Sequence, residues 1–251
     1  MYNVTVAAFR VSVSNTVSCF FVLEVVMRKG VFYTEIAYAL GLLLLAAGTA
    51  LTAWADFGIS MVVAPAYIVY LKLSEVLPWF TFGMAEYVLQ AIILGLLMIL
   101  MKKAKPGYFL SFGTTVLYGL LLDGAMGLTA LIPFTSVTTR VFVYVFGVLL
   151  CTSGIAMLFD TYLPPAAYEL FVKEISQKKG WDIHKCKTAY DCVSCLAAAG
   201  ISLLLFGCFE GIGIGTVLCA FVYGWLIGLF SKVYRKLWIF KDRFPWRGIF
   251  E

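Results

Sequence analysis

Charged side chains are scarce in this sequence: they make up 13% of its 251 residues, whereas hydrophobic residues make up 62%. An average soluble domain has about 25% charged and about 45–50% apolar residues. The mean hydropathy of +0.94 also lies far on the apolar side. This composition excludes an ordinary soluble domain and predicts an all-α polytopic membrane protein.

Histidine is almost absent, since His184 is the single one in the chain. No Ser–His–Asp set is possible elsewhere and no other catalytic constellation is visible, so we do not expect an enzyme. His184 does stand near Cys186, Cys192 and Cys195, and such side chains bind zinc. However, their spacing matches no standard zinc finger, and Cys192 and Cys195 lie on a segment that enters lipid. We therefore expect no metal and no cofactor.

Nucleic-acid binding is not indicated either. The net charge is +5, but the basic residues lie between hydrophobic runs and form no aromatic-interleaved patch. The glycine-rich run "GIGIGT" (211–216) would need a preceding strand in a soluble unit to serve as a phosphate loop. Membrane spans flank it here, so we expect its glycines to allow close backbone packing at a helix entry.

Six apolar runs approach the length of about 20 residues that a bilayer span needs. They cover residues 33–54, 82–102, 108–131, 137–158, 187–207 and 212–232. With the N-terminus in the cytoplasm, all but two of the 19 lysines and arginines fall on the cytoplasmic side. The exceptions are Lys72 and Arg140. Because basic loops are retained in the cytoplasm, we predict that both termini are cytoplasmic.

The chain contains an internal repeat. "GLLLLAAGTAL" (41–51) and "GVLLCTSGIAM" (147–157) share glycine, paired leucines, glycine and alanine in register. Each run leads to an aspartate, Asp56 or Asp160, and then to a proline-bearing half-segment. The order span, half-segment, span, span therefore occurs twice.

The half-segments, 57–73 and 161–176, are too short to span a bilayer and are interrupted by proline. If neither crosses, each unit has three spans, and the second unit enters the bilayer inverted, as in many secondary transporters. Irregular backbone at membrane depth is tolerated only where protein buries it or where it lines a wet cavity. We therefore expect the half-segments to re-enter from opposite faces and to form a midplane site. Interfacial half-helices lying flat, or full crossing to give eight spans, are the alternatives.

This organisation gives four parts. They are a cytoplasmic or interfacial lead-in (1–32), a first membrane repeat (33–132), a second membrane repeat (133–232) and a basic-aromatic cytoplasmic tail (233–251). The tail mixes Arg and Lys with Trp and Phe, which suits an interface with anionic lipid headgroups. The expected partners are the lipid bilayer and an unidentified small solute, with a protein partner or a homo-oligomer as further options.

Ionisable side chains at membrane depth are costly and usually face a cavity or the bundle interior. Asp123 is the sharpest case, because three leucines precede it well inside the third span. It is a candidate proton-coupling carboxylate, and a structural hydrogen bond to a neighbouring helix is the equal alternative. Glu169 and Lys173 lie four residues apart on the second half-segment, where they either line the site or pair with each other.

Four further residues are candidates for the solute or ion site. Glu86 and Asp191 lie near the starts of their spans, where capping of the helix N-terminus is the simpler interpretation. Tyr67 and Tyr168 occupy matching positions in the two half-segments. They line the cavity from either side, or they are ordinary interface aromatics.

Three stretches, in order, resemble the YczE/YitT-like bacterial integral membrane proteins. They are "LPPAAYELFVKEIS" (163–176), "KTAYD" (187–191) and "GIGIGT" (211–216). The likeness covers about residues 33–232. It implies a shared architecture and a location in the bacterial cytoplasmic (inner) membrane, but no particular activity.

Some positions of these stretches match the family pattern and others depart from it. Glu169 and Lys173 hold family positions in the second half-segment, although Ala-Tyr replaces the family's Pro-Gly before Glu169. Lys187 and Asp191 match its Lys-x-x-x-Asp, and Asp123 resembles the acid of its third span. The departure at Pro-Gly puts any shared fine chemistry in doubt.

The leading hypothesis is a secondary transporter of a small solute, with a midplane site formed by broken helices and Asp123 as a coupling residue. A substrate-binding membrane subunit of an ATP-driven uptake system is one alternative. A non-transporting membrane scaffold or regulatory protein is another. The sequence names neither the solute nor the coupling ion.

Overall fold

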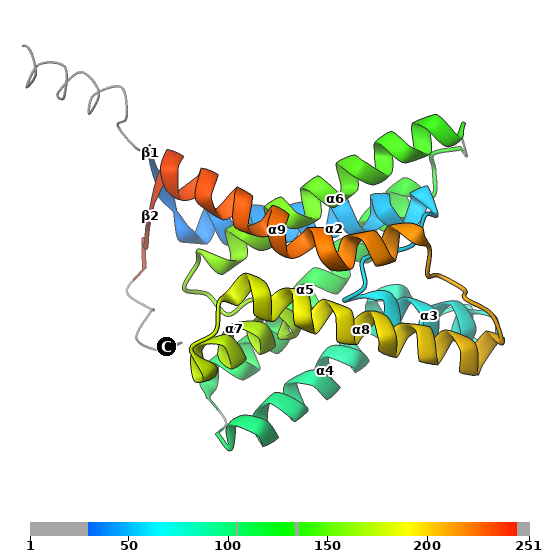
Figure 1. Ribbon diagram of the computed structural model, residues 1–251, viewed down its shortest axis with the longest axis horizontal. Coiled ribbons are helices and arrows are strands. Elements are labelled where there is room, and N and C mark those ends of the chain that lie inside the picture. The colour runs from blue at the N-terminus through cyan, green and yellow to red at the C-terminus, as the bar shows by residue number, and fades with distance from the viewer. Residues whose placement is uncertain (1–29, 104, 134–135, 245–251) are drawn as a thin grey trace, which may run out of the picture.

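The computed structural model describes residues 30–103, 105–133 and 136–244, and most of these residues are helical (Figure 1). The helices are α2 (Thr34–Ala55), α3 (Ala64–Ser74), α4 (Phe82–Met101), α5 (Pro106–Thr129), α6 (Val137–Phe159), α7 (Ala167–Lys179), α8 (Ile183–Phe206) and α9 (Ile214–Leu237). Two short strands, β1 (Gly30–Tyr33) and β2 (Trp238–Lys241), flank them. Most of the predicted lead-in and the end of the predicted tail lie outside the described residues.

Six helices, α2, α4, α5, α6, α8 and α9, have 20–24 residues and are apolar enough to cross a bilayer. They coincide with the six predicted spans, so the chain is a multi-pass membrane protein. Large apolar side chains cover the outside of the bundle, among them Phe142, Leu204 and Ile214, which are 72%, 86% and 82% exposed. Lipid tails are the solvent that such a surface requires.

Helix α8 begins four residues before the predicted span. The carboxylate of Asp182 accepts hydrogen bonds from the backbone N–H groups of His184 and Lys185 at 3.0 and 3.1 Å. These N–H donors, that of Lys185 above all, hold the pKa of Asp182 below its ordinary value. Such an N-cap starts a helix among polar residues, which an apolar-run criterion overlooks. As a result, Lys187 lies one turn inside α8.

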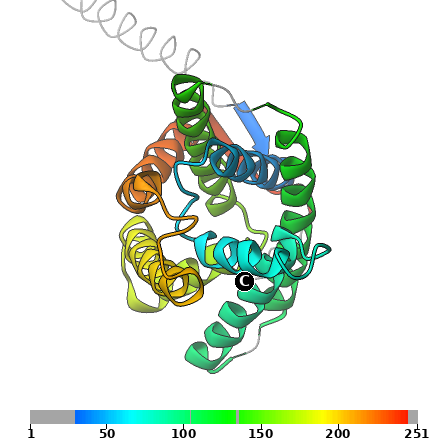
Figure 2. The same cartoon turned by 90° about the vertical axis from the view of Figure 1, so that its right-hand side faces the viewer.

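The half-segments contain the short helices α3 and α7, of 11 and 13 residues. The irregular backbone before each helix is buried in protein: Ile59 and Met61 before α3, and Tyr162 and Ala166 before α7, are at most 3% exposed. In Figure 1, α7 lies toward the end of the bundle that carries the strands and α3 toward the other end. Figure 2 looks from the α3 end, with several helices nearly end-on.

The centre of the bundle is the antiparallel pair α2–α6. Glycines allow the two backbones to touch: a Cβ atom on Gly48 would lie 2.6 Å from the carbonyl oxygen of Gly147, and one on Gly154 would lie 2.6 Å from that of Gly41. Around this pair, α2 packs on α5 and α6 packs on α9, while α4 packs on α5 and α8 packs on α9. The short helix α3 packs on α4 and α8, and α7 packs mainly on α8 and α4, with smaller contacts to α5 and α6.

The all-α prediction omitted the sheet. Strands β1 and β2 pair in parallel, with Gly30 opposite Trp238, so residues assigned to the lead-in and to the tail join at one end of the bundle. Aromatic and β-branched residues favour strands. However, β1 and β2 are separated by some 200 residues, so no local sequence pattern indicates that they pair. The sixth predicted span, 212–232, ends too early, because α9 continues to Leu237. Glu35 accepts hydrogen bonds from the backbone of Arg243 and Phe244 at 3.0 and 3.1 Å.

Replacing Gly48 by alanine tests the α2–α6 contact. The new methyl group would meet backbone atoms of α6 at 2.6–2.7 Å, and overpacking of this kind costs about 1–3 kcal/mol. We expect Gly48→Ala to lower the unfolding temperature of the purified protein in detergent. Gly95→Ala is the matched control, because nothing lies within 4 Å of its Cβ position. Equal behaviour of the two variants would contradict the close packing.

Candidate functional site

A group of polar side chains lies inside the apolar bundle, and we call it the central cluster. Its members are Glu86 and Gln90 of α4, Thr115 of α5, Tyr168 and Glu169 of α7, and Lys187 and Asp191 of α8. All seven are at most 3% exposed. Two consecutive pairs of helices, α4 with α5 and α7 with α8, therefore meet at one polar cluster.

Glu86 and Gln90 join α4 to the start of α7. They lie four residues apart and so share one face of α4. The Tyr168 hydroxyl and the Gln90 amide both donate to Oε2 of Glu86 at 2.9 Å. Oε1 of Gln90 accepts from the Thr115 hydroxyl at 2.7 Å and from the backbone N–H of Ala167 at 3.0 Å. A side chain of a span therefore satisfies an N–H group at the N-terminus of the half-helix, which has no cap of its own.

Lys187 and Asp191 form an ion pair on α8. The Lys187 ammonium lies 2.8 Å from Oδ1 of Asp191, and both side chains are 0% exposed. The same ammonium lies 5.7 Å from the centre of the Tyr190 ring and interacts electrostatically with Glu169. Removing one partner of such a pair leaves an uncompensated charge inside the protein.

Three carboxylates of the cluster keep one oxygen without a hydrogen-bond partner among the described residues. These oxygens are Oε1 of Glu86, Oε2 of Glu169 and Oδ2 of Asp191. Nearly all buried polar atoms in native proteins are hydrogen-bonded. Three such acceptors in one place are therefore unusual, and they are positioned to take a proton or a donor group of a ligand.

A small cavity of about 20 Å³ adjoins the cluster. Both half-segments line it, through Val62 and Val63 just before α3 and through Tyr168 and Glu169 at the start of α7. The N-terminal ends of the two short helices therefore reach the same internal space. Its volume suffices for about one water molecule.

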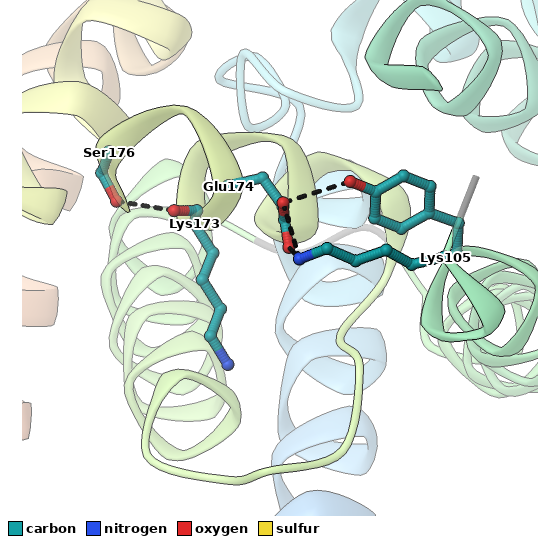
Figure 3. A network of polar contacts seen from close by, with 5 residues as sticks. Lys105, Lys173, Glu174 and Ser176 are labelled. Atoms are coloured by element: carbon teal, nitrogen blue, oxygen red, sulfur yellow. Dashed lines mark hydrogen bonds and ion pairs between the residues drawn. The ribbon is translucent and has the colours of Figure 1, made fainter. Parts of the chain in front are cut away.

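A larger polar pocket opens at each end of the bundle. The pocket beside α7 measures about 340 Å³, and its lining includes Lys105, Tyr108, Lys173 and Glu174. There the Lys105 ammonium and the Tyr108 hydroxyl donate to the Glu174 carboxylate at 2.9 and 3.1 Å (Figure 3). In the same view the Lys173 amine extends away from Glu174. We call this space the α7 pocket.

The pocket beside α3 measures about 200 Å³ and is called the α3 pocket. Asp56, Gly58, Tyr67 and Glu210 are among the residues that line it. It lies between the linker before α3 and the loop that joins α8 to α9, and Gly211 and Gly213 of the "GIGIGT" run border it. A Cβ atom on Gly213 would lie 2.0 Å from the Phe57 carbonyl oxygen, which explains that glycine by backbone contact.

The structure separates the sequence-predicted site residues into groups. Four of them belong to the central cluster: Glu86, Tyr168, Glu169 and Asp191. Lys173 lies in the α7 pocket and Tyr67 in the α3 pocket. Neither Glu86 nor Asp191 caps its helix, because Thr81 and Asp182 occupy those N-cap positions.

Asp123, the leading candidate from the sequence, lies outside the central cluster. Its carboxylate accepts from the backbone N–H of Gly83 and from the Thr81 hydroxyl, both at 2.9 Å. It therefore holds the N-terminus of the neighbouring helix α4. This is the structural hydrogen bond that the sequence analysis weighed against proton coupling.

Sequence reasoning missed Gln90, Thr115 and Lys187 as site residues. Gln90 follows Glu86 by four residues and Lys187 precedes Asp191 by four, so helical spacing was the available signal. Lys187 was instead counted among the cytoplasmic bases, but it is fully buried. Among the described residues, no group of three or more His, Cys, Asp or Glu side chains is placed to hold a metal ion.

Comparison with known proteins gives one match. A family model described as "Family of unknown function (DUF6198)" matches residues 32–232. No curated protein and no solved structure matches the chain. The resemblance to YczE/YitT-like proteins stays a prediction.

Lys187→Met tests the buried ion pair. The change leaves the Asp191 carboxylate without its cation, and breaking a buried pair costs about 3–5 kcal/mol. We expect a large fall in the unfolding temperature, partly restored in the double variant Lys187→Met, Asp191→Asn. Lys72→Met is the control, because its pair with Glu75 is 41% and 53% exposed and is worth about 0–1 kcal/mol. A double variant no better than the single one would contradict the pairing.

Proposed function

The chain belongs to the DUF6198 family over residues 32–232, and we propose that it is a secondary transporter of a small solute. The observation that carries the proposal is the central cluster: buried polar groups at the N-terminal end of α7, beside a small cavity that both half-segments line, with a polar pocket toward each end of the bundle. Broken helices that meet inside a membrane bundle commonly form solute sites.

An inverted repeat is part of this proposal. The helix contacts of α2–α5 have counterparts in α6–α9: α2–α5 corresponds to α6–α9, α4–α5 to α8–α9, and α3–α4 to α7–α8. Between the units, the packing of α3 on α8 corresponds to that of α7 on α4, whereas the smaller contact of α7 with α5 has no counterpart of similar size among the described residues. A two-fold axis in the membrane plane would produce this set of pairs.

The glycines of the α2–α6 contact support the same axis. The sequence repeat matches Gly41 with Gly147 and Gly48 with Gly154. In the structure Gly41 meets Gly154, and Gly48 meets Gly147. In a two-fold contact, residue i of one unit meets j of the other and j meets i. The two close approaches therefore have the reciprocity that two inverted units require.

The polar groups support a site rather than a purely structural role. Ionisable residues inside a membrane bundle are expensive, and they usually mark substrate or ion pathways. Glu86, Glu169 and Asp191 each keep an acceptor oxygen unused. A structural network would gain stability by satisfying those atoms, whereas a binding site keeps them for its ligand.

The two pockets suggest how access alternates. The α7 pocket and the α3 pocket each lie beside one half-helix and border a loop between two spans. The small cavity lies between the half-helix starts. Rocking of one unit against the other would open the centre to one pocket and then to the other. We place the α7 pocket on the cytoplasmic side, because the lysine-rich loops lie at that end.

The solute is identified by screening purified protein against metabolite pools for thermal stabilisation. A ligand at roughly 100 times its Kd stabilises by about 2.7 kcal/mol. We expect Tyr168→Phe, which removes the donor to Glu86, to weaken or abolish the shift. Tyr87→Phe removes a hydrogen bond of similar kind to the Val116 carbonyl and should retain it, as should Asp123→Asn. Shifts that depend on Asp123 and not on Tyr168 would contradict the assignment.

Orientation is tested at Cys208, an exposed residue in the loop between α8 and α9. Because this loop lies at the end opposite the lysine-rich loops, a membrane-impermeant maleimide added to intact cells should label it. Cys208→Ser should lose that label. Labelling of Cys208 only after the membrane is opened would reverse the proposed orientation.

A further inference from the structure

The central cluster contains more acid than base. Three of its side chains are carboxylic acids, and Lys187 is the only buried lysine or arginine among the described residues. The Lys187 ammonium bonds to Asp191 at 2.8 Å. Because Lys187 is already paired with Asp191, no unpaired buried positive charge is left in the described part of the chain to balance Glu86 and Glu169. If both were ionised, the bundle would hold uncompensated charge where burial is most costly.

The neighbours of Glu86 and Glu169 do not supply the missing cation. Of the groups that face them, α4 contributes Gln90, α5 contributes Tyr118, α6 contributes Cys151, α7 contributes Tyr168, and α8 contributes Tyr190 with the Lys187–Asp191 pair. Helix α2 adds the Thr49 hydroxyl. Apart from the ion pair, these are neutral donors and acceptors.

The hydrogen bonds show where a proton would sit. Oε2 of Glu86 already accepts from Tyr168 and Gln90 at 2.9 Å, whereas its Oε1 has no partner among the described residues. In Glu169, Oε2 is the atom without a partner. The two carboxyl groups also interact electrostatically, so ionising one disfavours ionising the other.

A route for the proton adjoins the pair. Glu169 lines the small cavity, which has room for about one water molecule. From there α7 runs to Lys173 and Glu174 in the α7 pocket. The exchange is a simple acid–base step, in which the O–H bond of the carboxylic acid breaks and the proton passes to water, leaving a carboxylate and hydronium.

We infer that Glu86 and Glu169 form a proton-binding pair that holds at least one dissociable proton at neutral pH. In the proposed transporter, release of that proton would be the coupling step. Only this coupling role rests on the proposed function; the proton-binding pair itself does not. A proton fits better than a metal ion, because no three His, Cys, Asp or Glu side chains among the described residues are placed to hold one together.

Infrared difference spectroscopy of the full-length protein in lipid nanodiscs tests the pair, with the proton itself as the probe. We expect a carbonyl stretch of a buried, protonated carboxylic acid at neutral pH, which shifts in D₂O and disappears as the pH rises. Glu86→Gln and Glu169→Gln should each remove or shift this band. Glu75→Gln, a change at an exposed residue, should leave it intact.

Glutamine mimics a neutral glutamic acid, so both variants should fold if the acids are protonated. Labelling of the unaltered protein provides a second measurement that needs no variant. A hydrophobic carbodiimide reacts with protonated carboxyl groups in apolar surroundings, and mass spectrometry should locate the adduct at Glu86 or Glu169, in an amount that falls as the pH rises.

The inference is overturned if the neutral-pH band is absent, if it persists in both variants, or if the adduct forms elsewhere. These measurements need no solute, so they separate this inference from the proposed function. A pH-dependent pair in a protein that no solute stabilises would leave the proton site standing and remove transport. Stabilisation by a solute in a protein that lacks the infrared band would leave the proposed transport standing and remove the proton-binding pair.

Discussion

Both half-helices begin inside an apolar bundle, and this placement constrains most of the structure. A helix N-terminus carries N–H groups without partners in the helix itself, and in hydrocarbon each unpaired group costs several kcal/mol. At α7 the spans supply the partners. Gln90 accepts from the N–H of Ala167, and the hydroxyls of Ser111 and Thr114 donate to the carbonyl groups of Pro165 and Pro164 at 2.6 and 2.9 Å.

The two half-helices meet this constraint differently. The start of α3 relies on its own chain, since the backbone N–H of Ala64 donates to the Ser60 carbonyl. The linker before it fits against the start of α9, where the N–H of Gly215 donates to the Phe57 carbonyl at 3.0 Å. The start of α7 instead depends on side chains of α4 and α5. The ionisable groups consequently gather around α7, and the chemistry of the cluster is not symmetric even where the backbone pairs correspond.

The spans could be predicted from the sequence because a bilayer imposes a length and an apolar character on each helix. The half-segments could also be predicted from the sequence, since Pro65, Pro164 and Pro165 interrupt apolar runs that are too short to cross a bilayer. Part of the site was also accessible, because Glu86 and Asp191 are conspicuous in apolar surroundings. The rest depends on three-dimensional contacts. Asp123 looks buried along the chain, but only the position of α4 shows that it binds the N-terminus of that helix.

The pairing of β1 with β2 has a consequence for the order of the two units. It holds the start of the first unit beside the end of the second, with Phe32 and Trp238 stacked at 5.0 Å. When chain ends lie close together, they can be joined and the chain opened elsewhere without disturbing the packing. Helix α5 ends and helix α6 begins at the opposite end of the bundle (Figure 1). The fold is therefore compatible with a circularly permuted chain in which α6–α9 is synthesised before α2–α5.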